Sequence, residues 1–353
     1  MVKHITLKDI AADMNISRTT VHRAINGKDG ISEELRTAIL ARAKEMGYTR
    51  NYVASSLKRR AKQLAVVLPE KSGQGRFYNK YIWDAIDSFM PEVESLNVKI
   101  LPYSYEHAAE QIDILEQLFN DEEIQIDGLL TVPANNSDKM SLAIERFSYK
   151  NIPVVLIDSD LEASRRLCCI APHDYMIGRL GAEIVAAMTP QNGKILVAAG
   201  DPLNAAHAHN LKGFQEYIKE QGKNFEVMVL QVYSDNDKCY NESCRILKEN
   251  PDICAFYAVT ARNTVPLAQA VIDSGLAGRL RGVGSDLFPE SAELLRQDVL
   301  QALIYKNAYD KGYKGFEILF SYVVKNIQPN TDKVDVPISI IMKNNLHSFN
   351  ERI

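Results

Sequence analysis

The stretch ITLKDIAADMNISRTTVHRAINGKDGISEELRTAILARAKEMGY (residues 5–48) holds the start and stop signals of three short helices. The tetrapeptide TLKD (6–9) is a capping-box pattern, and apolar residues follow it at helical spacing. Ser17 is placed to cap a second helix over 18–25, and Ser32 is placed to cap a third. Three short helices with a tight turn between the first two predict a helix-turn-helix unit.

The second of these helices has two chemically different faces. Val21, Ala24 and Ile25 point one way and predict a small apolar core. The opposite face carries two guanidiniums, a hydroxyl and an imidazole, from Arg18, Thr19, His22 and Arg23. Such groups can pair with base edges and phosphates in a DNA groove. The alternative interpretation is a solvated helix face without a partner.

The charge of the chain is divided unevenly along its length. Residues 1–62 hold 13 Lys and Arg against 6 Asp and Glu, a net charge of +7. The whole chain has a net charge of -4, so the remaining 291 residues carry -11. A compact basic head on an acidic body is typical of a protein that binds a polyanion, although a merely solvated charged surface would look the same.

Length and composition limit the other possibilities. At 353 residues the chain should form two or three compact units. No apolar stretch is long enough for a membrane span, and the start has no secretory h-region, so we expect a cytoplasmic, nucleoid-associated protein with no membrane partner. The five cysteines lack CxxC spacing, which predicts free thiols and neither a disulfide framework nor a metal site.

From residue 63 onward, apolar runs alternate with helical patterns. The expected strands are 64–69, 98–104, 127–133, 152–158, 193–200, 226–233, 255–260, 279–286 and 300–307. The expected helices are 78–96, 107–120, 137–149, 175–188, 207–222, 236–249, 264–275, 289–297 and 309–325. This alternation predicts parallel sheets in two α/β lobes, with a ligand cleft at the strand ends.

The expected division of the chain follows from these elements. We expect a head with a hinge over 1–61, the hinge itself lying at about 50–60, and a body over 62–353. Within the body, the first lobe should comprise about 63–160 and 298–325, and the second about 161–297 and 326–343. The chain should pass between the lobes near residue 160 and twice more later.

Residues 4–60 resemble the DNA-binding head of the lactose-repressor (LacI/GalR) family in the core ISRTTVHRAING, the helix start SEELR and the GY–N–A–SL hinge. The resemblance implies that Arg18, Thr19 and Arg23 read bases in the major groove. His22 stands where the family usually has a serine. The full set of expected DNA contacts is Thr6, Ser17, Arg18, Thr19, Thr20, His22, Arg23, Asn26, Asn51, Tyr52, Ala54, Leu57 and Lys58.

The hinge resemblance concerns NYVASSLKR (51–59). In the family this segment folds as a helix on DNA, and its leucine, which is Leu57 in this chain, wedges into the minor groove. The proline that usually precedes the hinge asparagine is Arg50, which removes a pre-set helix start and adds a charge. Judged by composition alone, this polar and basic segment could equally be a plain flexible linker.

The body resembles the sensing domain of the same family, which is similar to periplasmic sugar-binding proteins. The matching phrases include IPVVLIDSD, IGRLGAEIVAAM, GKILVAAG and GVGSD. The implied fold is α/β: a three-helix helix-turn-helix head with a hinge helix, then two doubly wound parallel sheets. The implied partners are a near-palindromic double-stranded operator, a second copy of the chain in a homodimer, and a small effector that is a sugar or sugar derivative.

The resemblance also implies which side chains meet the effector. The expected residues are Phe77, Tyr78, Asp158, His173, Asn210, Tyr233, Asn263, Asp286 and Lys306. Carboxylates suit paired hydroxyls, and aromatic rings suit the C–H face of a sugar ring. Each residue has an alternative role: Asp286 could cap a helix, for example, and Phe77 could be a core residue.

Three positions depart from the family pattern. Asn210 replaces an arginine, Lys306 replaces a glutamine, and His173 replaces an aspartate, with Asp174 next to it. These changes argue against a common hexose as the effector. Lys306 and His173 would suit a sugar acid or a phosphate, so a non-sugar metabolite or an anionic ligand is the alternative.

Other classes of protein find little support in the sequence. There is no Walker loop, complete dinucleotide-binding turn, nucleophile elbow or HExxH, so we expect neither an enzyme nor a cofactor. His207 and His209 are two residues apart and would point to different helix faces, which makes a metal site the less favoured interpretation. A transport binding protein would need an export signal and would lack the head.

Overall fold

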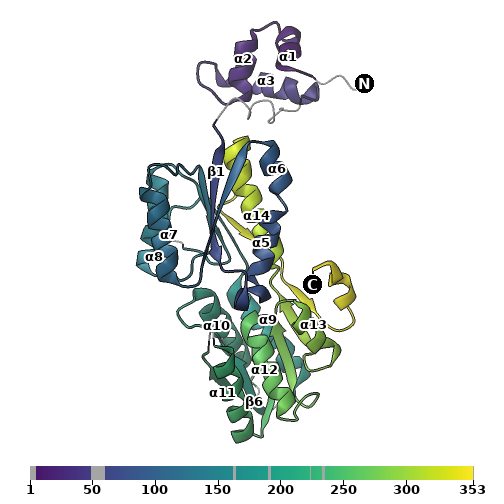
Figure 1. Cartoon of the computed structure of the whole chain (residues 1–353). Coiled ribbons are helices and arrows are strands. Elements are labelled where there is room, and N and C mark those ends of the chain that lie inside the picture. Colours follow the sequence, from purple (N-terminus) through teal and green to yellow (C-terminus); the bar gives the residue numbers. More distant parts are fainter. Residues whose placement is uncertain are drawn as a thin grey trace. The chain divides into compact units, whose positions relative to one another are not determined.

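The computed structural model describes residues 5–48, 60–161, 164–189, 192–222, 224–232 and 235–352. Its internal contacts divide the chain into two compact units, Met1–Arg60 and Ala61–Ile353, which we call the head and the body (Figure 1).

The head contains the three predicted helices, α1 (Leu7–Asp13), α2 (Arg18–Ile25) and α3 (Glu33–Glu45). Each predicted cap is present: Thr6 and Asp9 form a capping box, and Ser17 and Ser32 each accept a hydrogen bond from a backbone N–H of the first turn. The buried core of the head consists of Ile10, Ala11, Val21, Ala24, Ile39 and Ala43. Ile39 and Ala43 fill the inward face of α3, whereas Leu40 of the same helix is 44% exposed.

The first lobe of the body is built on a six-stranded sheet in which every pairing is parallel. Its strands, in the order β11-β5-β4-β3-β1-β2, are β1 (Lys62–Pro69), β2 (Val98–Tyr105), β3 (Gly128–Thr131), β4 (Val154–Ile157), β5 (Cys168–Ala171) and β11 (Lys333–Asp335). The central strands are buried on both faces, which is why they appear in the sequence as continuous apolar runs.

Helices cover both faces of this sheet (Figure 1). The helices of this lobe are α5 (Asn79–Asp87), α6 (Met90–Ser95), α7 (Ala108–Asn120), α8 (Asp138–Tyr149), α14 (Ala308–Phe320) and the π-turn η2 (Ser321–Lys325), and the short 3-10 helix η1 (Gly73–Phe77) precedes α5. The single helix predicted over 78–96 is divided into α5 and α6. Pro91 lies in the first turn of α6, where its missing N–H is tolerated, so it starts a new helix there.

The second lobe has a sheet with the order β12-β10-β9-β8-β6-β7. Its strands are β6 (Asn192–Ala198), β7 (Asn224–Leu230), β8 (Ile253–Ala258), β9 (Arg281–Ser285), β10 (Ala302–Tyr305) and the antiparallel β12 (Ser339–Ile341). Its helices are α9 (Asp174–Met188), α10 (Ala205–Glu220), α11 (Asn236–Glu249), α12 (Ala261–Asp273), α13 (Pro289–Arg296) and the 3-10 helix η3 (Leu346–Arg352). Buried clusters on the two faces of the sheet hold α9 and α10 on one side and α11 and α12 on the other.

The chain passes between the two sheets after β5, after β10 and after β11. The expected lobe boundaries therefore need correction. Residues 168–171 and 333–335 join the first sheet, whereas 302–305 pair with β9 in the second. The run CCIA (168–171) was not expected to be a strand, and periodicity does not say which sheet a strand will join.

Over the described ranges, no helix combines the length and apolar character that a membrane crossing requires. Within the same part of the chain, no three His, Cys, Asp or Glu side chains are grouped so that they could hold a metal ion.

Candidate functional site

Helix α2 presents the predicted DNA-reading face to solvent. Val21 and Ala24 are buried in the core of the head, whereas Arg18, Thr19, His22 and Arg23 are all exposed. The two guanidiniums, the hydroxyl and the imidazole therefore share one open helix surface. This is the arrangement that base and phosphate contacts require.

The other predicted contact residues of the head have structural bonds of their own. Thr6 caps α1, and Ser17 caps α2 while its Oγ lies 2.8 Å from Thr20 Oγ1. Asn26 Nδ2 donates to the backbone oxygen of His22 at 2.7 Å. The Ser17 and Asn26 bonds fix the two ends of α2, and the Thr6 bond fixes the start of α1.

Arg36 of α3 fixes the loop that follows α2. Its Nη2 donates to the Lys28 backbone oxygen at 2.9 Å, and its Nε donates to Glu33 at 3.0 Å. Gly30, with φ of 92°, lies against the Arg23 side chain, since a Cβ at that position would be 3.2 Å from Arg23 Nη1. The position of Arg23 therefore depends on this loop as well as on its own helix.

Six predicted site residues lie outside the described residues. They are Asn51, Tyr52, Ala54, Leu57 and Lys58 of the hinge, and Tyr233 of the body. Their expected roles stay predictions.

In the body, the first lobe contributes a buried ionic group at the ends of its strands. Asp158 follows β4 with φ of 70°, and Tyr78 donates to its Oδ1 at 2.7 Å. Lys311, on the first turn of α14, is wholly buried and bonds both Asp158 and the Tyr78 hydroxyl. Burial favours protonation of Asp158, but the Lys311 ammonium outweighs it and lowers the pKa of that carboxyl.

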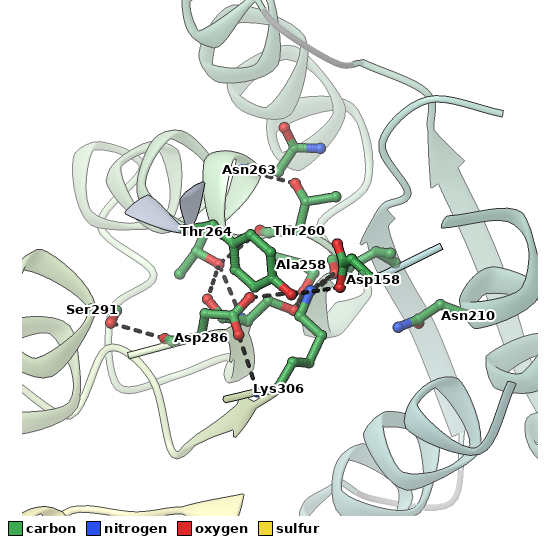
Figure 2. Close-up of polar contacts among 12 residues, drawn as sticks. Asp158, Asn210, Ala258, Thr260, Asn263, Thr264, Asp286, Ser291 and Lys306 are labelled. Atoms are coloured by element: carbon green, nitrogen blue, oxygen red, sulfur yellow. Dashed lines mark hydrogen bonds and ion pairs between the residues drawn. The ribbon is translucent and has the colours of Figure 1, made fainter. Parts of the chain in front are cut away.

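The second lobe contributes a matching pair. Asp286 follows β9 with φ of 63°, and its Oδ2 lies 3.1 Å from Lys306 Nζ, as Figure 2 shows. Among the described residues, Lys306 is the ion-pair partner of Asp286 Oδ2, and Lys306 Nζ also lies 3.5 Å from the Val259 backbone oxygen. Burial raises the pKa of Asp286, whereas Lys306 keeps a raised pKa because Asp286 and Asp158 outweigh its own burial. A carboxylate oxygen and an ammonium thus lie side by side with bonding capacity left.

The two ionic groups meet at Tyr78. Lys306 Nζ lies 5.3 Å and Lys311 Nζ 4.8 Å from the centre of its ring. Both ammonium groups lie within cation–π range of this ring, and the sugar stacking expected of Tyr78 stays a prediction. The ring joins a carboxylate–lysine pair from each lobe.

His173 and Asp174 begin α9, where the chain enters the second lobe. His173 is exposed, and its ring centre lies 6.4 Å from that of Tyr175. Burial, followed by the nearby Asp158 carboxylate, raises the pKa of Asp174 to about 7. Asp174 is thus electrostatically linked to the Asp158 group.

Asn210, Asn263 and Phe77 are buried and already bonded or packed. Asn210 Oδ1 accepts from the Tyr257 hydroxyl at 2.9 Å, and Figure 2 shows the Asn210 side chain apart from the Asp286–Lys306 pair. Asn263 Nδ2 donates to the Val232 oxygen at 2.9 Å. The Phe77 ring is 1% exposed and its centre lies 4.8 Å from that of Phe288, so the ring belongs to a contact between the lobes and offers no open face.

Lys311 and Asp174 were not among the residues predicted from the sequence. Lys311 lies in the segment YDKG (309–312), which shows only that a helix begins there, and its partner Asp158 is 153 residues away. Asp174 was noted only as the neighbour of His173. Each is an ionisable residue near the start of a helix that packs against its sheet. An ionisable residue in such a place is the signal by which the sequence could have indicated them.

Comparisons with known proteins agree with this architecture. Residues 6–51 match the bacterial regulatory proteins of the lacI family, and residues 64–326 match the periplasmic binding protein domain. The ribose operon repressor of Bacillus subtilis is 23% identical over 342 residues, which cover 95% of this chain and 97% of that protein. The HTH-type transcriptional regulator DegA of the same species is 25% identical over 79% of this chain and 77% of its own length.

Solved structures give the same fold. An ABC transporter solute-binding protein from Agrobacterium vitis with bound D-fucose superposes with a TM-score of 0.72 at 21% identity, covering 80% of this chain and 96% of that one. The lacI-family match over residues 6–51 covers the three helices of the head, and the periplasmic-binding-protein match over residues 64–326 lies in the two-lobed body. The chain therefore belongs to the lacI family of bacterial regulatory proteins, with a periplasmic binding protein domain as its body.

Proposed function

We propose that this protein is a homodimeric, cytoplasmic transcription regulator without enzymatic activity, which binds a near-palindromic operator and responds to a small effector. The observation that carries the proposal is the exposed face of α2, where Arg18, Thr19, His22 and Arg23 lie together above a buried core. A basic head of this kind supplies phosphate attraction through its net charge and base readout through these four side chains.

The effector that best fits the body is an uncharged, hydroxyl-rich molecule of the sugar type. Asp286 Oδ2 can accept a hydrogen bond from one hydroxyl group of the effector. Lys306 Nζ, 3.1 Å away, can donate a hydrogen bond to the oxygen of an adjacent hydroxyl group. Lys306 and Lys311 are each already balanced by a carboxylate, which disfavours the anionic ligand kept as the alternative. Relatives that include the ribose and sucrose operon repressors agree with a sugar.

Effector binding would act on DNA binding through the two lobes. Because the chain passes between the sheets three times, a change in how the lobes meet reaches the start of the body at β1. The operator affinity would then change by the factor by which the effector prefers one arrangement of the lobes over the other.

The test of DNA binding compares DNA from the protein's own upstream region with scrambled DNA over a range of salt concentrations. We expect a preference of more than ~10³ for the wild type. Arg18→Ala and Arg23→Ala should each reduce it, whereas Lys44→Ala, an exposed change on α3, should lower the affinity for both DNAs equally or leave it unchanged. Equal binding to scrambled DNA by the wild type would count against a sequence-specific regulator that acts at its own promoter.

The effector class is tested with a panel of neutral sugars, each paired with its acid and its phosphate. We expect a neutral sugar to raise the melting temperature and to change operator affinity, and Lys306→Met to weaken both effects. A panel in which only acids or phosphates bind would show that the anionic alternative is correct.

A further inference from the structure

The short helix η1 is a fixed projection of the first lobe. A Cβ on Gly75 would lie 1.8 Å from the Glu70 backbone oxygen, so only glycine fits at this turn. The Glu70 carboxylate accepts from the Ser72 N–H at 3.1 Å and from Ser104 Oγ at 2.8 Å. Asn79 Nδ2 donates to the Glu70 backbone oxygen at 3.2 Å, which closes the other end of the segment.

Three side chains of this projection, those of Gln74, Arg76 and Phe77, bond or pack against the second lobe. Asn236 Nδ2 of α11 donates to Gln74 Oε1 at 3.1 Å. Arg76 Nη2 donates to Glu290 Oε1 of α13 at 2.7 Å. The Phe77 ring centre lies 4.8 Å from that of Phe288, in a small apolar cluster with Ala261 of α12. An amide, an ion pair and an apolar contact thus hold one segment of the first lobe to three helices of the second.

The next residue of the chain is Tyr78, which bonds Asp158 and Lys311. Movement of η1 away from the second lobe would therefore move the backbone of Tyr78, where the two ionic groups meet. A cavity of about 790 Å³ adjoins the Arg76–Glu290 pair and is lined by Tyr81, Tyr305 and Arg352 among others. The Arg76 side chain has room to turn into this space when the pair separates.

We propose that η1 is a latch between the lobes, and that the Gln74, Arg76 and Phe77 contacts set the balance between the latched and released arrangements of the body. The latch itself rests on contacts within the body, and its effect on operator affinity rests on the proposed function. The Arg76–Glu290 pair is the adjustable part, because both side chains are about half exposed and such pairs exchange readily. The Phe77–Phe288 contact is the buried part.

The test is a charge swap in the full-length chain, read out by hydrogen exchange of peptides that cover residues 70–80. Arg76→Glu places two carboxylates together and should speed exchange in this segment at least threefold. It should also change operator affinity at least threefold. The double variant Arg76→Glu/Glu290→Arg restores an ion pair of opposite direction and should return both values to within twofold of wild type. Lys343→Glu, which breaks the exposed Lys343–Asp298 pair within the second lobe, should change neither.

The latch would be overturned if residues 70–80 of Arg76→Glu exchange hydrogen at the wild-type rate. It would also be overturned if the double variant does not restore slow exchange. Faster exchange with unchanged operator affinity would confirm the latch and overturn its link to DNA. If the wild type itself binds no operator, the proposed function fails, while the exchange data still decide the latch. A melting curve for each variant shows that it is folded, and the double variant guards against a mere loss of folding in the single one.

Discussion

Lys311 is buried without any solvent contact, and it is balanced by the Asp158 carboxylate and the Tyr78 hydroxyl. Substitution Lys311→Met would remove the ion-pair partner of the partly buried Asp158 carboxylate and leave Tyr78 as its hydrogen-bond donor. We expect this change to lower the free energy of unfolding by about 3–5 kcal/mol, measured by urea denaturation. The double variant Asp158→Asn/Lys311→Met should recover part of the loss.

The matched control for Lys311 is Lys343→Met, which removes one partner of an exposed pair and should cost less than about 1 kcal/mol. Similar losses for the two lysine variants would contradict the view that burial is what makes the Lys311 pair important.

Asp174 gives the body a pH dependence of known sign. Its folded-state pKa is about 7, raised from 3.8 first by burial and then by Asp158. Between these values the unfolded chain has released the proton while the folded chain retains it, so wild-type stability falls as pH rises from about 4 to about 7. Asp174→Asn removes this loss. The melting temperature of the variant should therefore exceed that of the wild type by a larger margin at pH 8 than at pH 5.

The control is Asp113→Asn, an exposed change on α7, whose difference from wild type should be small at both pH values. A gain for Asp174→Asn that is equal at pH 5 and pH 8 would show that the Asp174 carboxyl does not titrate in this range.

Individual site residues were only partly predictable from the sequence. Arg18, Thr19, His22 and Arg23 could be assigned to one face because helical spacing alone decides which residues share it. Asp158 and Asp286 were found through a resemblance that also predicted Asn210 and Phe77, which are buried in packing contacts. Lys311 was not predicted because its partners are distant in sequence, and a local sequence pattern does not indicate a long-range ion pair.

At the scale of elements, α9 and α10 approach so closely that their backbones touch. A Cβ on Gly213 would lie 2.0 Å from the Tyr175 backbone oxygen, and a Cβ on Gly178 would lie 1.8 Å from the Asn210 backbone oxygen. Gly213→Ala should therefore force the helices apart and lower the free energy of unfolding by roughly 1–3 kcal/mol, as overpacking does elsewhere.

Thermal unfolding measures the effect of Gly213→Ala, with Glu183→Ala, an exposed change on α9, as the control. An alanine that raises stability through its better helix propensity would show that the two helices can separate without loss.

Most of the longer elements were predictable, and so were several of the fully buried strands. The apolar runs of β1, β3 and β4 indicate strands buried on both faces, and these strands were expected. β11 and β12 have three residues each, too few for a period to appear, whereas β5 was missed although it is as short and as buried as β3 and β4. Their positions come from pairing with strands far away in the chain, which a local pattern does not contain.

At the scale of the whole molecule, both sheets depend on the segment after residue 332. β11 pairs with β5 at the edge of the first sheet, and β12 pairs with β10 at the edge of the second. A fragment of the body over 61–326 would lack both strands and leave the edges of β5 and β10 unpaired. We expect this fragment to unfold at a lower temperature than 61–353 and to aggregate, as shown by melting curves and size-exclusion chromatography.

A fragment as stable and monodisperse as the longer body would show that the two edge strands contribute little. The matched comparison is a chain that keeps both strands and carries Ile340→Thr, a change at an exposed position of β12.

The threefold passage between the sheets also has a consequence during synthesis on the ribosome. Neither lobe is a continuous piece of chain, so neither can be completed and set aside before the other begins. A message cut short before codon 333 yields two unfinished lobes at once, each with an open strand edge for quality-control proteases and chaperones to recognise. We therefore expect truncated chains to be degraded together with their heads. A head able to bind DNA would then not accumulate on a body that cannot respond to the effector.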